Sequence, residues 1–226
     1  EKPVRFEFSV TGRVAPTIPQ VSTNQSSTST LSPKTKINTA TSSSGVGEKI
    51  RVALSFRGAP SITADSNVRI FDGEGNHLND GISIRAGEKI KILRSDDAYI
   101  VKFADKKVLT KSHIRIGSQN GILKIDNFEN RPAWNQELND NEYRGVLEVR
   151  WVGDPSHPLG GELKVINELP LEHYLYGIGE VSNGDPTEKI KTIITLARTY
   201  ATYYMDRRGT SEAKFPGKPY DLDDDP

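Results

Sequence analysis

The sequence contains no cysteine, which excludes a disulfide scaffold, a thiolate metal site and a cysteine nucleophile. Neither sign of charge is in excess, because 30 Lys and Arg residues balance 30 Asp and Glu residues. Proteins that bind nucleic acid usually carry a basic surface, so nucleic acid is not an expected partner. The chain also lacks a run of about 18 to 20 apolar residues, the length that spans a bilayer. We therefore expect membrane attachment only through an N-terminal anchor preceding Glu1.

Several common catalytic and metal-binding motifs are also missing. The sequence has no Walker loop, no dinucleotide-binding fingerprint after a strand, no HExxH and no GxSxG elbow. Its four histidines show no ligand spacing. The aspartates near the C-terminus, Asp221 and Asp223 to Asp225, lack the spacing and closing glutamate of a calcium loop, so we expect a solvated acidic loop there. No metal and no cofactor are expected.

Apolar residues make up only 35% of the chain, which indicates that part of its length packs into no core. Residues 17–48 are rich in Ser and Thr without apolar periodicity, and are predicted to be a disordered linker. Before them, residues 4–10 alternate apolar and polar side chains like a strand. We interpret residues 1–16 as the end of an upstream β-module; the alternative is that this strand joins the sheet of the main domain. The main domain is assigned to residues 49–226.

The first part of the main domain shows the alternating pattern of short strands. Turn residues separate the runs, including Asp72-Gly73-Glu74-Gly75 and Ala86-Gly87. This organisation predicts an antiparallel meander. The predicted strands cover residues 50–56, 68–71, 82–84, 89–93, 99–103, 114–116, 121–125, 143–151 and 163–166.

Two helices are predicted in the C-terminal half. The shorter opens at Leu169-Pro170 and ends near Gly177 or Gly179. The longer begins at Asp185-Pro186-Thr187-Glu188, where Asp185 would cap the first amides and Glu188 would complete a capping box. Apolar residues then recur at three- and four-residue spacing, so this helix should pack on the sheet. We therefore predict an α+β fold: an antiparallel, β-rich domain with two helices of the C-terminal half packed on the sheet, preceded by a disordered Ser/Thr-rich linker.

Two charged residues stand out as candidate site residues. Glu180 lies between the helices among small and apolar neighbours, a setting that can raise a carboxyl pKa so that the group both donates and accepts a proton. The alternative is a solvated loop glutamate. Arg198 lies at the edge of the apolar face of the longer helix, from which it can reach a neighbouring site. Its alternative is an arginine that extends to water or pairs with a surface acid.

Three strings connect these residues to a known family. YRGVLEV at 143–149, VINELPLEHYLYGIGEV at 165–181 and TLARTYATYY at 195–204 resemble, in that order and spacing, the SpoIID/LytB family, which includes stage II sporulation protein D. IRVALSF from Ile50 resembles the usual start of the domain. The resemblance is strongest over the last third of the chain. It implies that residues 49–226 form a SpoIID-like domain that continues beyond Pro226.

Family members characterised as enzymes are lytic transglycosylases. They cut the bond between N-acetylmuramic acid and N-acetylglucosamine in peptidoglycan and prefer glycan without stem peptides. By resemblance, Glu180 is the acid/base and Arg198 holds the site together or orients Glu180. Ser182, Asn183 and Lys191 are candidate substrate-binding residues.

The sequence departs from the family pattern in two places. Val181-Ser182-Asn183-Gly184 replaces the usual Met-Pro after the glutamate, and Lys191-Thr192-Ile193-Ile194 replaces Lys-Ala-Gln-Ala before the arginine. Two other functions therefore stay open: a cell-wall binding module or amidase enhancer, as described for the LytB side of the family, and a plain surface module with an exposed Glu180. The expected partners are peptidoglycan glycan strands and a cell-wall amidase. The expected location is extracytoplasmic, in the cell wall or envelope.

Overall fold

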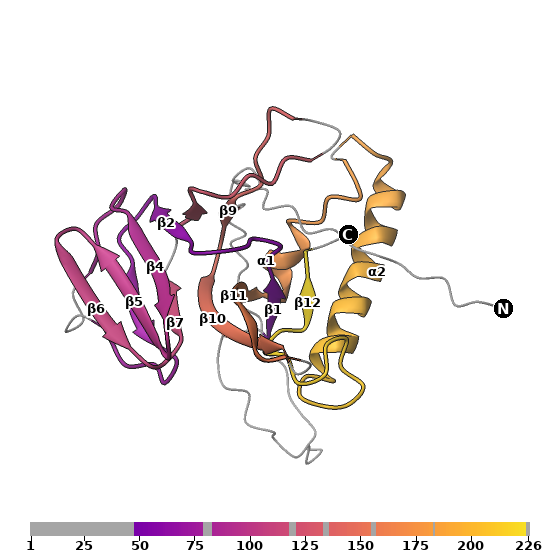
Figure 1. The fold of residues 1–226 in the computed structure, drawn as a ribbon. Coiled ribbons are helices and arrows are strands. Elements are labelled where there is room, and N and C mark those ends of the chain that lie inside the picture. The colour runs from indigo at the N-terminus through magenta and orange to yellow at the C-terminus, as the bar shows by residue number, and fades with distance from the viewer. Residues whose placement is uncertain are drawn as a thin grey trace, which may run out of the picture.

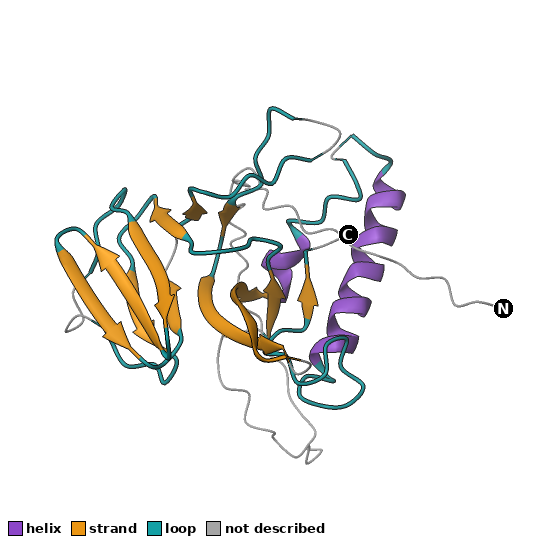
Figure 2. Cartoon of the chain, viewed as in Figure 1, coloured by secondary structure: helices purple, strands orange, loops and turns teal. Residues whose placement is uncertain are grey.

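The computed structural model describes residues 48–78, 83–117, 121–132, 136–154, 157–182 and 184–224. The strand predicted at 4–10 and all but the last residue of the predicted linker lie outside the described residues. The described part forms two antiparallel-rich sheets and two helices (Figures 1 and 2), which confirms the predicted α+β fold. Neither helix of this part is long and apolar enough to cross a membrane.

The first sheet carries the long strands of the C-terminal half. Its strand order is β12 (Leu222–Asp223), β1 (Lys49–Ala53), β11 (His157–Pro170), β10 (Val146–Asp154), β7 (Ile114–Gly117) and β3 (Arg69–Asp72). All its pairings are antiparallel except that of β1 with β12, where Val52 lies opposite Leu222 in a parallel register. The C-terminal segment thus returns to the start of the domain and adds an edge strand there.

The second sheet is built from the N-terminal half of the domain. Its order is β6 (Lys106–Thr110), β5 (Ala98–Phe103), β4 (Ile90–Ser95), β2 (Ser61–Ala64), β8 (Leu123–Ile125) and β9 (Glu142–Tyr143). β4, β5 and β6 follow one another as the predicted meander does, and β8 pairs with the next strand, β9; the pairings of β2 with β4 and β8 pass over intervening strands. The strand predicted at 82–84 is not formed in its described part, because Ile84 makes only an isolated bridge to Val68.

Two apolar cores hold these layers together. Residues of both sheets form one cluster, so the sheets pack against each other through side chains such as Ile62, Val101 and Val149. The second cluster joins the first sheet to helices α1 (Leu171–Leu175) and α2 (Thr187–Met205). In Figure 1, α2 lies beside the first sheet, on the side away from the second sheet.

The start of α2 differs from the predicted capping box. Pro186 occupies the N-cap, and no side chain caps the first amides. Asp185 therefore precedes the cap, and its carboxylate accepts from the backbone N–H of Ser182 at 2.7 Å and pairs with Lys189 at 2.8 Å. Glu188 pairs instead with Lys191, one turn later. The predicted helix is confirmed. The carboxylate of Asp185, which was expected to cap the helix, instead bonds within the turn that precedes it.

A single glycine explains why the strand predicted at 143–151 is divided between the two sheets. Gly145 has φ +87°, and a Cβ there would lie 2.4 Å from the carbonyl oxygen of Glu168. The chain turns at this point from β9 of the second sheet into β10 of the first. Neither the dihedral angle nor the contact is compatible with a side chain.

The prediction of a solvated acidic loop near the C-terminus is wrong for two of its aspartates. Asp221 and Asp224 are 3% and 7% exposed. Asp221 accepts from the backbone N–H of Arg51 at 2.9 Å and pairs with Arg208 at 2.6 Å. Asp224 accepts from the backbone N–H of Ser55. These carboxylates fasten the returning C-terminal segment to β1 and the residues after it.

Replacing Gly145 with alanine should destabilise the domain more than replacing Gly75. Both glycines have φ near +88°, so each alanine would cost about 1–2 kcal/mol of backbone strain. Only at Gly145 would the new Cβ also collide with backbone, because at Gly75 nothing lies within 4 Å. Urea unfolding of Gly145→Ala and Gly75→Ala measures the difference. Equal free energies of unfolding would contradict the close packing at Gly145.

Stability should fall as the pH rises from about 4 to 7 because of Asp224. Burial raises the pKa of this carboxyl from 3.8 to about 7, against the opposing hydrogen bonds from Ser55. In that window the folded chain binds a proton that the unfolded chain has released, so each pH unit costs up to about 1.4 kcal/mol. Denaturant titrations should show a flatter pH profile for Asp224→Asn than for the wild type, and no flattening for Asp105→Asn in an exposed turn.

Candidate functional site

Glu180 lies in the connection between α1 and α2, at the edge of the second core. Ile178, two residues before it, is 6% exposed and belongs to that core. The Glu180 side chain is itself partly buried, and its Oε2 atom is shielded from solvent. The structure therefore places this carboxyl against the apolar layer that joins helices to sheet, and not in a fully solvated loop.

Tyr174 of α1 shares this environment. Its side chain is 1% exposed, and its hydroxyl has no hydrogen-bond partner among the described residues. Burial is the main cause of a raised pKa for the Tyr174 phenol, followed by the charges of Glu180 and Tyr200. The Tyr174 hydroxyl therefore lies within the field of the Glu180 carboxylate and stays protonated at neutral pH, as a hydrogen-bond donor.

Tyr200 and Lys214 connect the surroundings of Tyr174 to the C-terminal segment. Lys214 pairs with Asp223 of β12 at 2.9 Å, and its ammonium lies 5.8 Å from the centre of the Tyr200 ring. Burial opposes the charge on Lys214, but the interactions with Asp223 and Tyr200 outweigh it, so the pKa of Lys214 is raised. Tyr200 of α2 therefore interacts with Tyr174 on one side and with Lys214, the partner of Asp223 in β12, on the other.

Arg198 links the two helices. Its Nη2 and Nε atoms donate to the two carboxylate oxygens of Glu172 on α1, at 2.7 and 3.2 Å. This bidentate hydrogen bond raises the pKa of the Arg198 guanidinium, and the charge of Glu172 adds to the effect. The pair is the surface-acid arrangement considered as the alternative for this arginine. It fixes α1, and so the residues that lead into Glu180, against α2.

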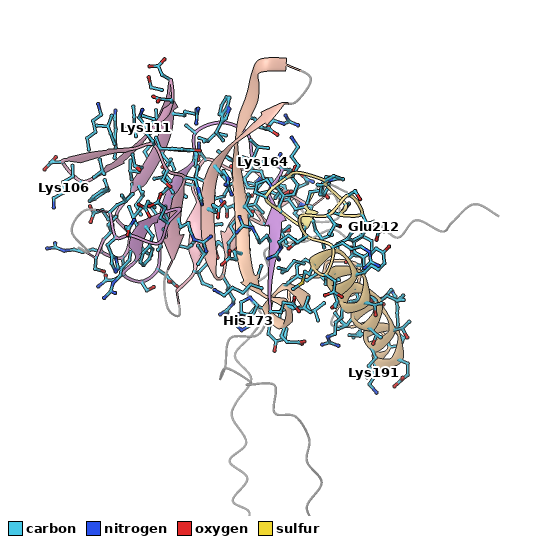
Figure 3. All side chains as sticks on the ribbon, turned by 90° about the horizontal axis from the view of Figure 1, so that it is seen from below. Lys106, Lys111, Lys164, His173, Lys191 and Glu212 are labelled. Carbon is cyan, nitrogen blue, oxygen red and sulfur yellow. The ribbon has the colours of Figure 1, made fainter. Side chains whose placement is uncertain are left out.

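The other predicted site residues are not gathered around Glu180 by the contacts that the structure records. The Ser182 hydroxyl accepts from the backbone N–H of Gly184 at 3.1 Å, which holds the turn before α2. Lys191 is exposed at the start of α2, points away from the sheet in Figure 3, and pairs with Glu188 at 2.9 Å. Asn183 lies outside the described residues. The substrate-binding roles of all three stay predictions.

Glu172 and Tyr174 are the neighbours that sequence reasoning did not identify as site residues. The ring of Tyr174 packs in the second core, and apolar spacing gives no sign of a role for its hydroxyl. Glu172 is adjacent to the matched Leu-Pro-Leu string and precedes Glu180 by eight positions, so its charge was the one signal available. Its pairing with Arg198 depends on how α1 and α2 pack, which the sequence pattern does not specify.

The cavities described by the structure lie elsewhere. One of about 310 Å³ is lined by Trp151 and by residues 216–219, and another of about 380 Å³ is lined by arginines of the first sheet. Neither has Glu180 in its wall. The described residues also include no group of three or more His, Asp or Glu side chains arranged to hold a metal ion.

Comparisons with known proteins support the family assignment over one part of the chain. A family model described as SpoIID, stage II sporulation protein, matches residues 159–225. Searches of curated proteins and of solved structures gave no match. The matched segment contains most of β11, both helices and β12, and with them Glu180, Arg198 and Glu172. The match over residues 159–225 agrees with the resemblance to the SpoIID/LytB family predicted from the sequence.

Proposed function

We propose that this protein cleaves peptidoglycan glycan strands as a lytic transglycosylase, with Glu180 as its single acid/base. The observation that carries the proposal is the environment of Glu180 inside the matched segment. One carboxylate oxygen is shielded from solvent, and the buried phenol of Tyr174 lies within its field. Enzymes that cleave glycosidic bonds often hold their general acid where solvent is partly excluded.

The reaction needs only one carboxyl group. Protonated Glu180 donates its proton to the oxygen of the bond between N-acetylmuramic acid and N-acetylglucosamine as that bond breaks. The resulting carboxylate then takes the proton of the muramic acid 6-hydroxyl, whose oxygen bonds to C1 and closes a 1,6-anhydro ring. Glu180 is thereby protonated again. Ordinary glycoside hydrolysis requires a second carboxylate at a set distance, and this route does not.

The recorded contacts give Arg198 an indirect part in this proposal. Arg198 holds Glu172 with two hydrogen bonds, and Glu172 lies on the helix that precedes Glu180. We therefore treat Arg198 as a positioning residue that keeps the Glu180 connection in place. Tyr174 lies on the same short helix, so a shift of α1 would move the phenol as well as the chain leading into Glu180.

The second candidate is a glycan-binding module that enhances a cell-wall amidase. One observation favours it: the partner recorded for Arg198 is Glu172, a surface acid. Such a module would bind glycan strands without cutting them, and its binding would not depend on the Glu180 proton.

Glu180→Gln should lower the release of anhydromuramyl products from peptide-free glycan by a factor of about 10² to 10⁴, because an amide cannot exchange the proton. Mass spectrometry of the digest measures the products. Glu188→Gln, an exposed substitution on α2, is the control and should leave the yield unchanged. An unchanged yield in Glu180→Gln would rule out the mechanism. Absence of products from the wild type, with glycan binding kept in Glu180→Gln, would favour the binding module.

Arg198→Ala and Glu172→Ala should lower kcat to a similar extent, and the double variant should be no worse than either. The pair is exposed, so each substitution should cost less than about 1 kcal/mol of stability. Kinetics on peptide-free glycan test the coupling of the two residues, since groups that act as one unit are not additive. Lys111→Ala and Asp97→Ala, an exposed pair distant in sequence from both helices, serve as the control. Full activity in Glu172→Ala with none in Arg198→Ala would instead place Arg198 on the substrate.

A further inference from the structure

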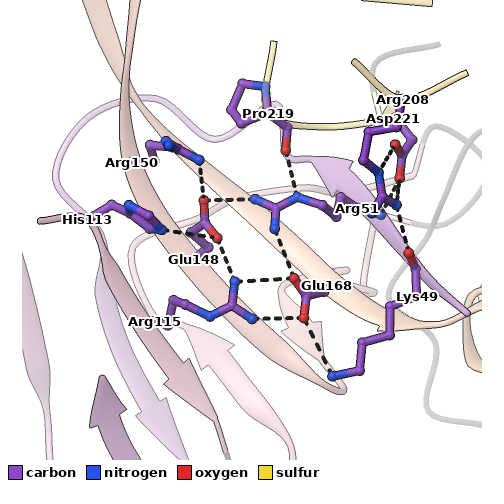
Figure 4. Close-up of polar contacts among 10 residues, drawn as sticks. All are labelled: Lys49, Arg51, His113, Arg115, Glu148, Arg150, Glu168, Arg208, Pro219 and Asp221. Carbon is purple, nitrogen blue, oxygen red and sulfur yellow. Dashed lines mark hydrogen bonds and ion pairs between the residues drawn. The ribbon is translucent and has the colours of Figure 1, made fainter. Parts of the chain in front are cut away.

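The face of the first sheet that carries Arg51 holds a layer of charged side chains instead of an apolar core. The registers place Arg51 opposite Glu168, and Arg115 opposite Glu148. Alternation along β10 then puts Arg150 on the same face as Glu148, two residues away. Figure 4 shows these side chains converging from β1, β7, β10 and β11. Glu148 is only 1% exposed, and the other members of the layer are partly buried.

The returning C-terminal segment lies next to this layer and lines an open cavity with it. The Pro219 carbonyl accepts from Arg51 Nε at 2.6 Å, and Arg208 is held by Asp221. This open cavity of about 380 Å³ has five cationic side chains in its wall. They are Arg51, Arg115, Arg150, Arg208 and Lys218.

The cations in this wall outnumber the carboxylates bonded to them. Glu148 and Glu168 serve the arginines of the sheet, and Asp221 serves Arg208. Five cations against three carboxylates leave an excess of two positive charges among these eight side chains. His113 also lines the cavity, but burial, its main influence, lowers its pKa, and the neighbouring arginines add to that effect.

The inner and outer cations differ in how fully they are bonded. Arg51 and Arg115 each contact both glutamates at 2.8–3.2 Å, which fixes their positions. Arg150 makes one recorded contact of 3.3 Å, to Glu148. The recorded bond of Lys218 goes to the carbonyl oxygen of Gly153 at 3.0 Å and leaves two of its three ammonium hydrogens for another acceptor. Most donors are therefore unused at Arg150 and Lys218, whereas Arg208 has recorded bonds at both Nε and Nη2.

These two residues also stand where the two described cavities meet. The second cavity, of about 310 Å³, shares Arg150, Lys218 and Pro219 with the first and continues along Trp151 and Gly153. A ligand that reached the charged layer would thus have room for a neutral portion beside Gly153 and residues 216–219. The joined cavities are lined by the chain alone and are separate from Glu180.

We propose that this cavity binds an oxyanion, a carboxylate or a phosphate group, through Arg150 and Lys218, with Arg51 and Arg115 as a fixed positive floor. Two cations with unused donors at one mouth match the two oxygens that either group presents. The excess positive charge is costly while unbalanced and becomes attractive when an anion enters. The site is independent of the proposed cleavage of glycan, because it uses none of the residues assigned to that reaction.

Isothermal titration calorimetry on the whole chain tests this site without any turnover. The probes are inorganic phosphate, N-acetylmuramic acid, and N-acetylglucosamine, which lacks the lactyl carboxylate of the second probe. We expect millimolar or tighter binding of an anionic probe that weakens as sodium chloride is raised, and no binding of N-acetylglucosamine. Binding of phosphate alone identifies a phosphate ligand; binding of N-acetylmuramic acid identifies a carboxylate ligand.

Arg150→Ala and Lys218→Ala should each weaken binding of that probe about tenfold, and Lys189→Ala, a cation on α2, should not change it. Thermal unfolding verifies that each variant is folded, and both tested side chains lie at the partly exposed rim. No binding of either anion, or binding that is unaffected by both substitutions, would overturn the proposal. Equal binding of the two sugars would overturn recognition of the carboxylate.

Discussion

Glu148 and Glu168 are shared between arginines from different strands, and the first sheet depends on this sharing. Arg51 of β1 and Arg115 of β7 each contact both carboxylates, so strands at opposite sides of β11 and β10 are joined through two side chains. Glu148 is almost fully buried, and removing one member of such a group leaves charges without partners at a cost of about 3–5 kcal/mol. The opposite face of the sheet is free to pack apolar side chains against the helices and the second sheet.

The same charges determine where the C-terminal segment lies. Arg51 donates to the Pro219 carbonyl, and its own backbone N–H donates to Asp221, which in turn binds Arg208. Parallel strand β12 then continues along β1, and Lys214 of the same segment reaches Tyr200 of α2. One segment therefore contacts the charged face of the sheet and the helix layer next to Glu180. The two regions are structurally connected even though their chemistry is separate.

Much of this fold could be predicted because apolar periodicity reports burial directly. The apolar stripe of α2 includes Ala197 and Ala201, and both are buried in the second core, as the spacing of the stripe indicates. The structure differs from the prediction where the conformation of a residue depends on a contact that is distant in sequence. Gly145 divides a regular alternation because the carbonyl of Glu168 leaves no room for a Cβ. Asp221 reads as solvated in the sequence because its partner, Arg208, is brought to it only when the segment returns to β1.

The candidate site shows the same limit more sharply. Motif order identified Glu180 and Arg198, but motif order states no partner for either residue. In the structure Arg198 pairs with Glu172, and the charge of Glu180 acts on the phenol of Tyr174. Both partners lie on α1, a helix of only five residues that follows β11 without a loop. Because β11 also carries Glu168, the charged layer and the Glu180 connection are attached to the same strand. A displacement of α1 would therefore move the Glu180 carboxyl group. The first sheet would stay fixed, because Glu148 and Glu168 hold its strands together.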